Sequence, residues 1–137
     1  TRWVTRFGLL EGPSGWRLPS TLVKFPLQYG YPSEYTSAVN TIQKSGEFDA
    51  WLHGLRDLMG KAQIALRLDR AARGNFGDCE PVGEGVSEMR IHYGPGYRVY
   101  FTRRGKVIYL LLLGGDKSTQ QRDIKRAINM ASALPEE

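Results

Sequence analysis

The run VIYLLLL, at residues 107–113, is the feature that most limits what this chain can fold into. Side chains alternate between the two faces of a sheet, so a strand that is apolar at every position needs cover on both faces. The run is far too short to span a bilayer. It therefore predicts a central, buried strand and no membrane segment.

Two segments before this run have the alternating pattern of half-buried strands. In VSEMRIHY (86–93) the apolar residues at 89, 91 and 93 alternate with polar ones, and in YRVYFT (97–102) the apolar set occupies positions 97, 99 and 101. GPG at 94–96 reverses the chain between them, and Arg-Gly at 104–105 turns it into the central run. The pattern predicts three consecutive antiparallel strands.

Two helices are predicted ahead of these strands. Ser45 is a suitable cap for the first, which has an apolar stripe over residues 48–58 and a stop at Gly60. The second follows directly and ends at Gly74, with Arg67 assigned to its exposed face.

A third helix is predicted after the strands. Ser118 and Gln121 have the spacing of a capping box, and apolar residues continue at helical spacing as far as Leu134. Residues 74–85, GNFGDCEPVGEG, are predicted to form a loop. The predicted fold class is therefore α+β, with two helices before the sheet strands and one after them.

The first 38 residues differ from the rest. They are rich in Pro, Gly, Ser and Thr and keep neither the helical nor the strand period. We expect an irregular extension over residues 1–38, with at most a short strand at TLVKF (21–25), and one domain over 39–137. One hypothesis is that the natural product begins at Val39, because a valine codon can start bacterial translation.

Composition narrows the choice of chemistry. The chain of 137 residues has one cysteine, Cys79, and two histidines, His53 and His92. We expect no internal disulfide, no metal site and no cofactor. No charged-then-apolar leader is seen, so a reducing, cytoplasmic location fits best. The net charge of +5 and a pI near 9.5 suggest an anionic partner.

The positive charge is concentrated in the strand region. Residues 90–126 hold nine Lys or Arg and two Asp, whereas residues 39–89 hold six basic and eight acidic residues. If the first two strands pair with their apolar sets on the same side, the polar set shares the opposite face. We expect that face to be a concave, basic surface suited to phosphate, carrying Glu88, Arg90, His92, Arg98 and Tyr100.

Three long motifs, spread over the part of the chain after residue 47, carry a resemblance to a known family through their order and spacing. They are FDAWLHGLRD, RLDRAARGNFGDCEPVGEGVSEMRIHYGPGYRVYF and LLLGGDKSTQQRDIKRA. With these motifs the chain resembles the RelE/ParE toxin superfamily, specifically the HigB-like group of addiction module killer proteins with phage relatives. The resemblance runs from about Asn40 to Leu134.

The resemblance implies a RelE-like, microbial-ribonuclease-like fold, a twisted antiparallel sheet with helices on one face. It also implies the toxin of a type II toxin–antitoxin pair, acting as a ribosome-dependent, metal-independent endonuclease that cleaves messenger RNA. The implied partners are messenger RNA, the ribosome with its 16S rRNA, and a cognate helix-turn-helix antitoxin. Operator DNA would be reached only through that antitoxin.

The resemblance and the residues together give a candidate catalytic set. His92 is the candidate acid or base, since histidine is the residue type whose ordinary pKa lies near neutrality. Arg98, which matches the arginine of the family's GYR motif, and Arg90 would stabilise the phosphorane, while Lys117 holds a neighbouring phosphate. Asp116 would orient His92 or serve as a second proton carrier.

A second set of residues is assigned to RNA binding. Tyr100 shares the basic face and would stack on a base. Arg103, Arg104 and Lys106 lie at a hairpin turn and either contact ribosomal RNA or form a solvated tip. Arg122, in the last helix, completes the set.

Two other functions stay open. The second branch of the superfamily poisons DNA gyrase and lacks the nuclease residues, and a degenerate toxin would act only as a co-repressor with its antitoxin. Arg90, His92 and Arg98 on one face favour the nuclease. At Asp123 or its neighbours, however, some relatives have a base-stacking tyrosine, so cleavage preference does not transfer.

Overall fold

The structure, a computed structural model, describes residues 3–5, 8–9, 39–106 and 108–135. One sheet runs through it in the strand order β2-β1-β3-β7-β6-β5-β4. Its strands are β1 (Trp3–Thr5), β2 (Gly8–Leu9), β3 (Thr41–Ser45), β4 (Cys79–Gly83), β5 (Val86–Ile91), β6 (Tyr97–Arg104) and β7 (Ile108–Asp116). The helices are α3 (Gly46–Gly54), α4 (Leu58–Ala72), the short 3₁₀ helix η2 (Lys117–Thr119) and α5 (Gln120–Ser132).

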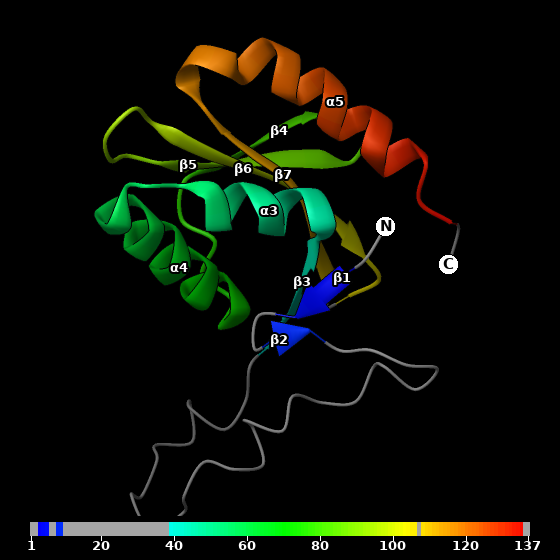
Figure 1. Cartoon of the computed structure of the whole chain (residues 1–137). Coiled ribbons are helices and arrows are strands. Elements are labelled where there is room, and N and C mark those ends of the chain that lie inside the picture. Colours follow the sequence, from blue (N-terminus) through cyan, green and yellow to red (C-terminus); the bar gives the residue numbers. More distant parts are fainter. Residues whose placement is uncertain (1–2, 6–7, 10–38, 107, 136–137) are drawn as a thin grey trace, which may run out of the picture.

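The sheet lies between helices on both of its faces (Figure 1). Helices α3 and α4 cover one face, and α5 covers the other. The α+β fold class is confirmed, but the expectation that all helices lie on one face is wrong. The apolar composition of β7 explains the difference, because a strand that is apolar at every position is stable only when both faces are covered.

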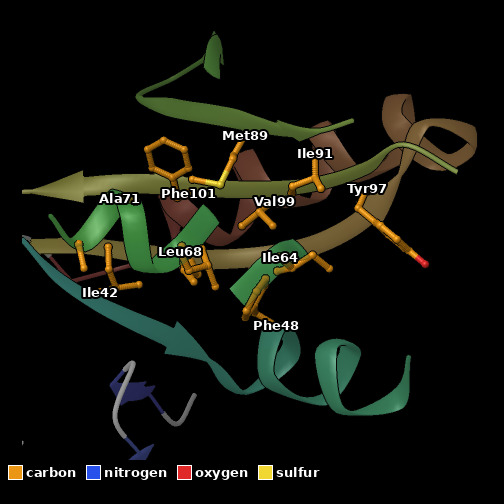
Figure 2. Packing of buried hydrophobic residues seen from close by; sticks show 12 residues of the cluster. Ile42, Phe48, Ile64, Leu68, Ala71, Met89, Ile91, Tyr97, Val99 and Phe101 are labelled. Carbon is orange, nitrogen blue, oxygen red and sulfur yellow. The ribbon is translucent and has the colours of Figure 1, made fainter. Parts of the chain in front are cut away.

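The larger core lies under α3 and α4. Figure 2 shows side chains from both helices pointing toward those of the central strands. A smaller core lies under α5, around Tyr100, Leu112, Leu113 and Ala127. The larger core contains Ile42, Phe48, Ile64, Leu68, Ala71, Met89, Ile91, Tyr97, Val99 and Phe101.

The three predicted strands are confirmed as β5, β6 and β7, each antiparallel to the next. The turn between β5 and β6 contains Gly94 and Gly96, both at positive φ, a conformation that favours glycine. The predicted loop at 74–85 is wrong in part, because it contains β4. Pro81 obscured this strand, but proline is tolerated on an edge strand such as β4.

Strand β3 was not predicted, and it makes the sheet mixed because it pairs in parallel with β7. It is anchored at both ends by side chains. Before the strand, Asn40 donates from Nδ2 to the carbonyl oxygen of Ala71, at 2.9 Å. At its end, Ser45 Oγ donates to the Leu112 carbonyl, at 2.7 Å, and accepts from the Phe48 N–H, at 3.0 Å. The predicted helix cap at Ser45 is confirmed.

The break between α3 and α4 lies at residues 55–57 rather than at Gly60. Asp57 caps α4 by accepting from the Gly60 N–H, at 2.9 Å, and it also accepts from the Tyr97 hydroxyl, at 2.8 Å. These two hydrogen bonds hold the pKa of Asp57 below its usual value, and burial with the Asp57 contact raises the pKa of Tyr97 to about 12. Gly60 is needed for close approach, since a Cβ there would lie 2.6 Å from the Tyr97 ring.

The last helix begins differently from the prediction. Asp116 caps η2 by accepting from the Ser118 N–H, at 2.8 Å, and Thr119 Oγ1 donates to Asp123, at 2.5 Å. The predicted capping box between Ser118 and Gln121 is therefore wrong. Asp116, the last residue of β7, is the cap of η2, whereas no side chain caps the start of α5 by a hydrogen bond.

Strands β1 and β2 lie within the segment that was predicted to be irregular. Strand β1 pairs with β3 and extends the sheet on the side away from the β5–β6 hairpin. The predicted short strand at 21–25 lies outside the described residues.

Two consecutive glycines at the end of β7 let helices approach both faces of the sheet. A Cβ added at Gly114 would lie 2.1 Å from the Trp51 ring of α3. One added at Gly115 would lie 2.0 Å from Asp123 Oδ2 of α5. Because no real Cβ contact is that short, only glycine fits at either position.

Gly115→Ala is expected to lower the free energy of unfolding by about 2 kcal/mol, because the new methyl group overpacks the contact with α5. Gly54→Ala is the matched control, since nothing lies within 4 Å of a Cβ there. The control should leave stability unchanged or raise it by up to about 1 kcal/mol. Urea unfolding measures both, and equal effects would contradict the close packing at Gly115.

Candidate functional site

A fully buried carboxylate, Glu88, is at the centre of the polar groups that the sequence placed on one face of β5 and β6. Its Oε1 accepts from Arg90 Nε at 3.0 Å, and its Oε2 accepts from the Tyr100 hydroxyl at 3.1 Å. Gln120, from the first turn of α5, donates to the same Oε2 at 2.7 Å. The carboxylate therefore joins two strands to the helix that covers them.

Arg98 is largely buried beside this carboxylate, with 8% of its surface exposed. Its Nη1 donates to the carbonyl oxygens of Gly96, at 3.0 Å, and Tyr97, at 3.2 Å. Its Nε lies 3.7 Å from Glu88 Oε1 and has no hydrogen-bond partner among the described residues. One negative charge thus offsets part of the positive charge of Arg90 and Arg98.

The predicted shared face is confirmed for four of its five residues. Glu88 lies opposite Tyr100, and Arg90 lies opposite Arg98. The face is covered by α5 rather than being an open concave surface. His92 follows the end of β5 and is exposed.

Tyr100 is completely buried, so the expectation that it stacks on an RNA base is wrong for this structure. Its hydroxyl donates to Glu88, and its ring packs in the core under α5. Burial first, and then the negative charge of Glu88, raises the pKa of Tyr100 well above its ordinary value. Tyr100 is therefore a structural residue. It belongs, with Arg90, Arg98 and Gln120, to the group of side chains around Glu88, which we call the Glu88 cluster.

His92 has a different carboxylate partner from the one expected. Its Nε2 lies 2.6 Å from Oδ2 of Asp78, and 71% of the imidazole surface is exposed. This hydrogen bond holds the pKa of Asp78 below its usual value. Asp116 instead accepts from Ser118, so the predicted pairing of Asp116 with His92 is wrong.

Arg98 and Lys117 come together at the β5–β6 turn. A Cβ added at Gly96 would lie 3.4 Å from Arg98 Nη1 and 3.4 Å from Lys117 Cβ. Lys117 is exposed, and it follows Asp116, whose partner across the sheet is Tyr97. The structure therefore gathers the candidate catalytic residues at one end of the sheet, with His92 and Lys117 open to solvent.

The predicted RNA-binding residues are divided between two ends of the sheet. Arg103, Arg104 and Lys106 lie at the far end of β6, with Arg103 five residues from Arg98, or about 17 Å along the strand. Arg103 donates to the Gly105 carbonyl at 2.7 Å, and Arg104 donates to the Pro135 carbonyl. They therefore do not contribute to the same site as His92.

Helix α5 has a basic outer surface. Arg122, Lys125 and Arg126 of α5 are exposed, as is Lys117 of the preceding η2, and the only acidic residue of α5, Asp123, is buried. Arg122 lies close to the candidate catalytic residues in sequence and has a side chain that is 78% exposed. These four residues form what we call the α5 basic surface.

Sequence reasoning missed three residues that hold the site together. Arg67 was predicted to lie on the exposed face of its helix. Its guanidinium group instead donates to the carbonyls of Arg90, Phe76 and Asp78. Gln120 reaches Glu88, and Asp78 reaches His92. Arg67 is three residues from Ile64, on the border of the buried stripe, and this spacing was the available signal.

Among the described residues, no group of three or more His, Cys, Asp or Glu side chains is arranged to hold a metal ion. None of the helices in the described part of the chain is long and apolar enough to cross a membrane.

Comparison with known proteins gives one relationship. Over 87 residues the chain is 49% identical to a protein of Haemophilus influenzae described as an uncharacterized protein, and the match covers 64% of this chain and 88% of that protein. The chain belongs to the same family as this Haemophilus protein. No protein-family model matches the chain, and no solved structure matches it. The function is therefore argued from the site.

Glu88→Gln is expected to lower the free energy of unfolding by about 3 kcal/mol, because Arg98 would stay buried without a counter-charge. Glu80→Gln removes the same charge from an exposed position on β4 and should change stability by less than about 0.5 kcal/mol. Urea unfolding would measure both. A Glu88→Gln variant as stable as its control would show that the carboxylate does not anchor the cluster.

Proposed function

We propose that this protein is the toxin of a type II toxin–antitoxin pair and cleaves messenger RNA on the ribosome without a metal ion. The proposal starts from the resemblance to HigB-like toxins. The observation that carries it is the grouping of an accessible histidine, His92, with Arg90, Arg98 and Lys117 at one end of the sheet. The reaction would take place in the bacterial cytoplasm.

These side chains supply the parts that RNA cleavage by its own 2′-hydroxyl needs. His92 takes the proton of the attacking hydroxyl. Lys117 and the guanidinium groups of Arg90 and Arg98 stabilise the charge that builds up on the phosphorane. Arg90 is the more open of the two arginines, with 34% of its side chain exposed.

The α5 basic surface supports a contact with ribosomal RNA. Its residues are charged and its neighbours on the same helix face, Gln121 and Asn129, are polar. Interfaces with nucleic acid are polar and positively charged, whereas the centre of a protein interface is depleted of charge. The surface includes Lys117, which lies at the same end of the sheet as His92, so a ribosome bound there would present its messenger RNA close to His92.

The proposal includes an antitoxin as a binding partner. In the toxin family that this chain resembles, the antitoxin carries a helix-turn-helix domain. Helix α4 exposes three large apolar side chains, Leu58, Met59 and Leu66, with exposed surface fractions of 75%, 59% and 44%. Apolar surface of this kind is what a protein partner buries on binding. The partner surface would then lie on the face of the sheet opposite the α5 basic surface (Figure 1).

A second candidate function is toxicity without RNA cleavage, of the gyrase-poisoning kind. Two observations favour it. Glu88 offsets part of the charge of Arg90 and Arg98, and Tyr100 is not accessible to a base. Both candidates predict growth arrest, but only the first predicts cut messenger RNA.

The test is induction of the full chain in a bacterial host, with growth measured alongside primer extension on an abundant transcript. We expect growth arrest together with discrete new RNA ends. His92→Gln should reduce cleavage about 100-fold or more, because it removes the acid–base group. His53→Gln, at an exposed position of α3, is the matched control and should cleave normally.

Arrest without new RNA ends would support the second candidate. New ends that persist in the His92→Gln variant would move the catalytic site away from this end of the sheet. Circular dichroism of each purified variant confirms that it is folded.

A further inference from the structure

The exposed imidazole of His92 is held by a residue that was not among the predicted site residues. Asp78 lies in the loop between α4 and β4, and its Oδ2 is 2.6 Å from His92 Nε2. We infer that Asp78 is the positioning residue of the site: its carboxylate accepts the Nε2 proton of His92 and leaves Nδ1 as the nitrogen that takes the proton of the RNA 2′-hydroxyl. This inference rests on the proposed nuclease function.

The loop that carries Asp78 is fixed from two sides. Arg67 of α4 donates to the carbonyls of Phe76, at 2.9 Å, and Asp78, at 3.3 Å, and also to the carbonyl of Arg90. The N–H of Arg90 donates to the Asp78 carbonyl at 2.9 Å. One guanidinium thus ties the loop to β5, so the carboxylate is held beside the strand that leads to His92.

A glycine in the loop leaves room for the guanidinium group of Arg67. Gly77 has φ of +66°, and a Cβ there would lie 2.8 Å from Arg67 Nη2. Another residue at this position would be strained and would push the arginine away. The loop sequence Gly77-Asp78 therefore fits the binding of Arg67 and the placement of the carboxylate together.

The protonation of the pair follows from the chemistry of its two groups. The hydrogen bond from His92 lowers the pKa of Asp78, so the carboxyl group is ionised at neutral pH. An ionised carboxylate only accepts hydrogen bonds. The proton between the two groups therefore belongs to Nε2, and a neutral His92 has its free lone pair on Nδ1.

The free Nδ1 has a defined role in the cleavage step. The proton of the 2′-hydroxyl moves to Nδ1 as the O2′–P bond forms, and the imidazolium that results is stabilised by Asp78. The P–O5′ bond breaks, and the leaving oxygen takes a proton from water, whose hydroxide then neutralises the imidazolium. The products are a 2′,3′-cyclic phosphate and a 5′-hydroxyl, with no change in oxidation state.

The test combines a spectroscopic signature with cleavage. Long-range ¹H–¹⁵N correlation spectra of the imidazole groups report which nitrogen carries the proton, and His53→Gln assigns the signals, since the chain has two histidines. Asp78→Asn puts an amide in place of the carboxylate, and its NH₂ can donate to Nε2. Glu80→Gln removes the same charge from a neighbouring exposed residue and is the control.

We expect the neutral His92 of the wild-type protein and of Glu80→Gln to carry its proton on Nε2. In Asp78→Asn the Nδ1–H form should gain population, and RNA cleavage should fall about 100-fold or more. The Glu80→Gln variant should cleave like the wild type.

A wild-type His92 without a preference for the Nε2–H form, or an Asp78→Asn variant with unchanged tautomer and cleavage, would overturn the inference whether or not RNA is cut. If the tautomers behave as expected but the wild-type protein cuts no RNA on the ribosome, the proposed nuclease function is wrong. The catalytic role of the His92 and Asp78 pair then fails with it, although Asp78 still sets the tautomer. The spectra therefore separate the two failures.

Discussion

The burial of β7 on both faces is the constraint on which the rest of the structure depends. An apolar strand cannot leave either face to water, so α3 packs on one side and α5 on the other. Gly114 and Gly115 allow both helices to approach the backbone at the end of the strand. The position of η2 and α5 then decides the site, because Gln120 in the first turn of α5 reaches Glu88, while Lys117 of η2 meets Arg98 at Gly96.

The Glu88 cluster is the second constraint, and it separates structural from accessible polar groups. A buried carboxylate is stable only when hydrogen bonds and opposite charges compensate for lost hydration, and here Arg90, Arg98, Tyr100 and Gln120 do so. The contacts of this cluster fix where the Arg90 and Arg98 guanidinium groups lie. His92 lies outside it, on the exposed turn, and its own carboxylate comes from another element. The cluster therefore supports the site, while the His92 and Asp78 pair faces the solvent.

Local patterns predicted what local forces decide. Alternation identified β5 and β6, positive-φ glycines marked the turns, and Ser45 was found as a cap. Alternation also predicted that Glu88 and Tyr100 share a face, but it did not predict that they are buried, because burial depends on where α5 packs. The apolar run predicted cover on both faces of β7, whereas the resemblance implied helices on one face, and the residues were the better guide. Asp78 and His92 are fourteen residues apart on different elements, so no spacing rule joins them.

The chemical nature of the RNA ends tests the central claim most directly. Purified protein would be incubated with ribosomes and messenger RNA. In a parallel reaction, a chelator would remove free divalent ions after the messenger RNA has bound to the ribosomes. The RNA fragments of both reactions would be analysed by mass spectrometry. Cleavage that uses the 2′-hydroxyl and His92 gives 2′,3′-cyclic phosphate and 5′-hydroxyl ends in both reactions. Fragments with 5′-phosphate and 3′-hydroxyl ends, or cleavage that stops when divalent ions are removed while ribosomes stay intact, would contradict a metal-independent nuclease at this site.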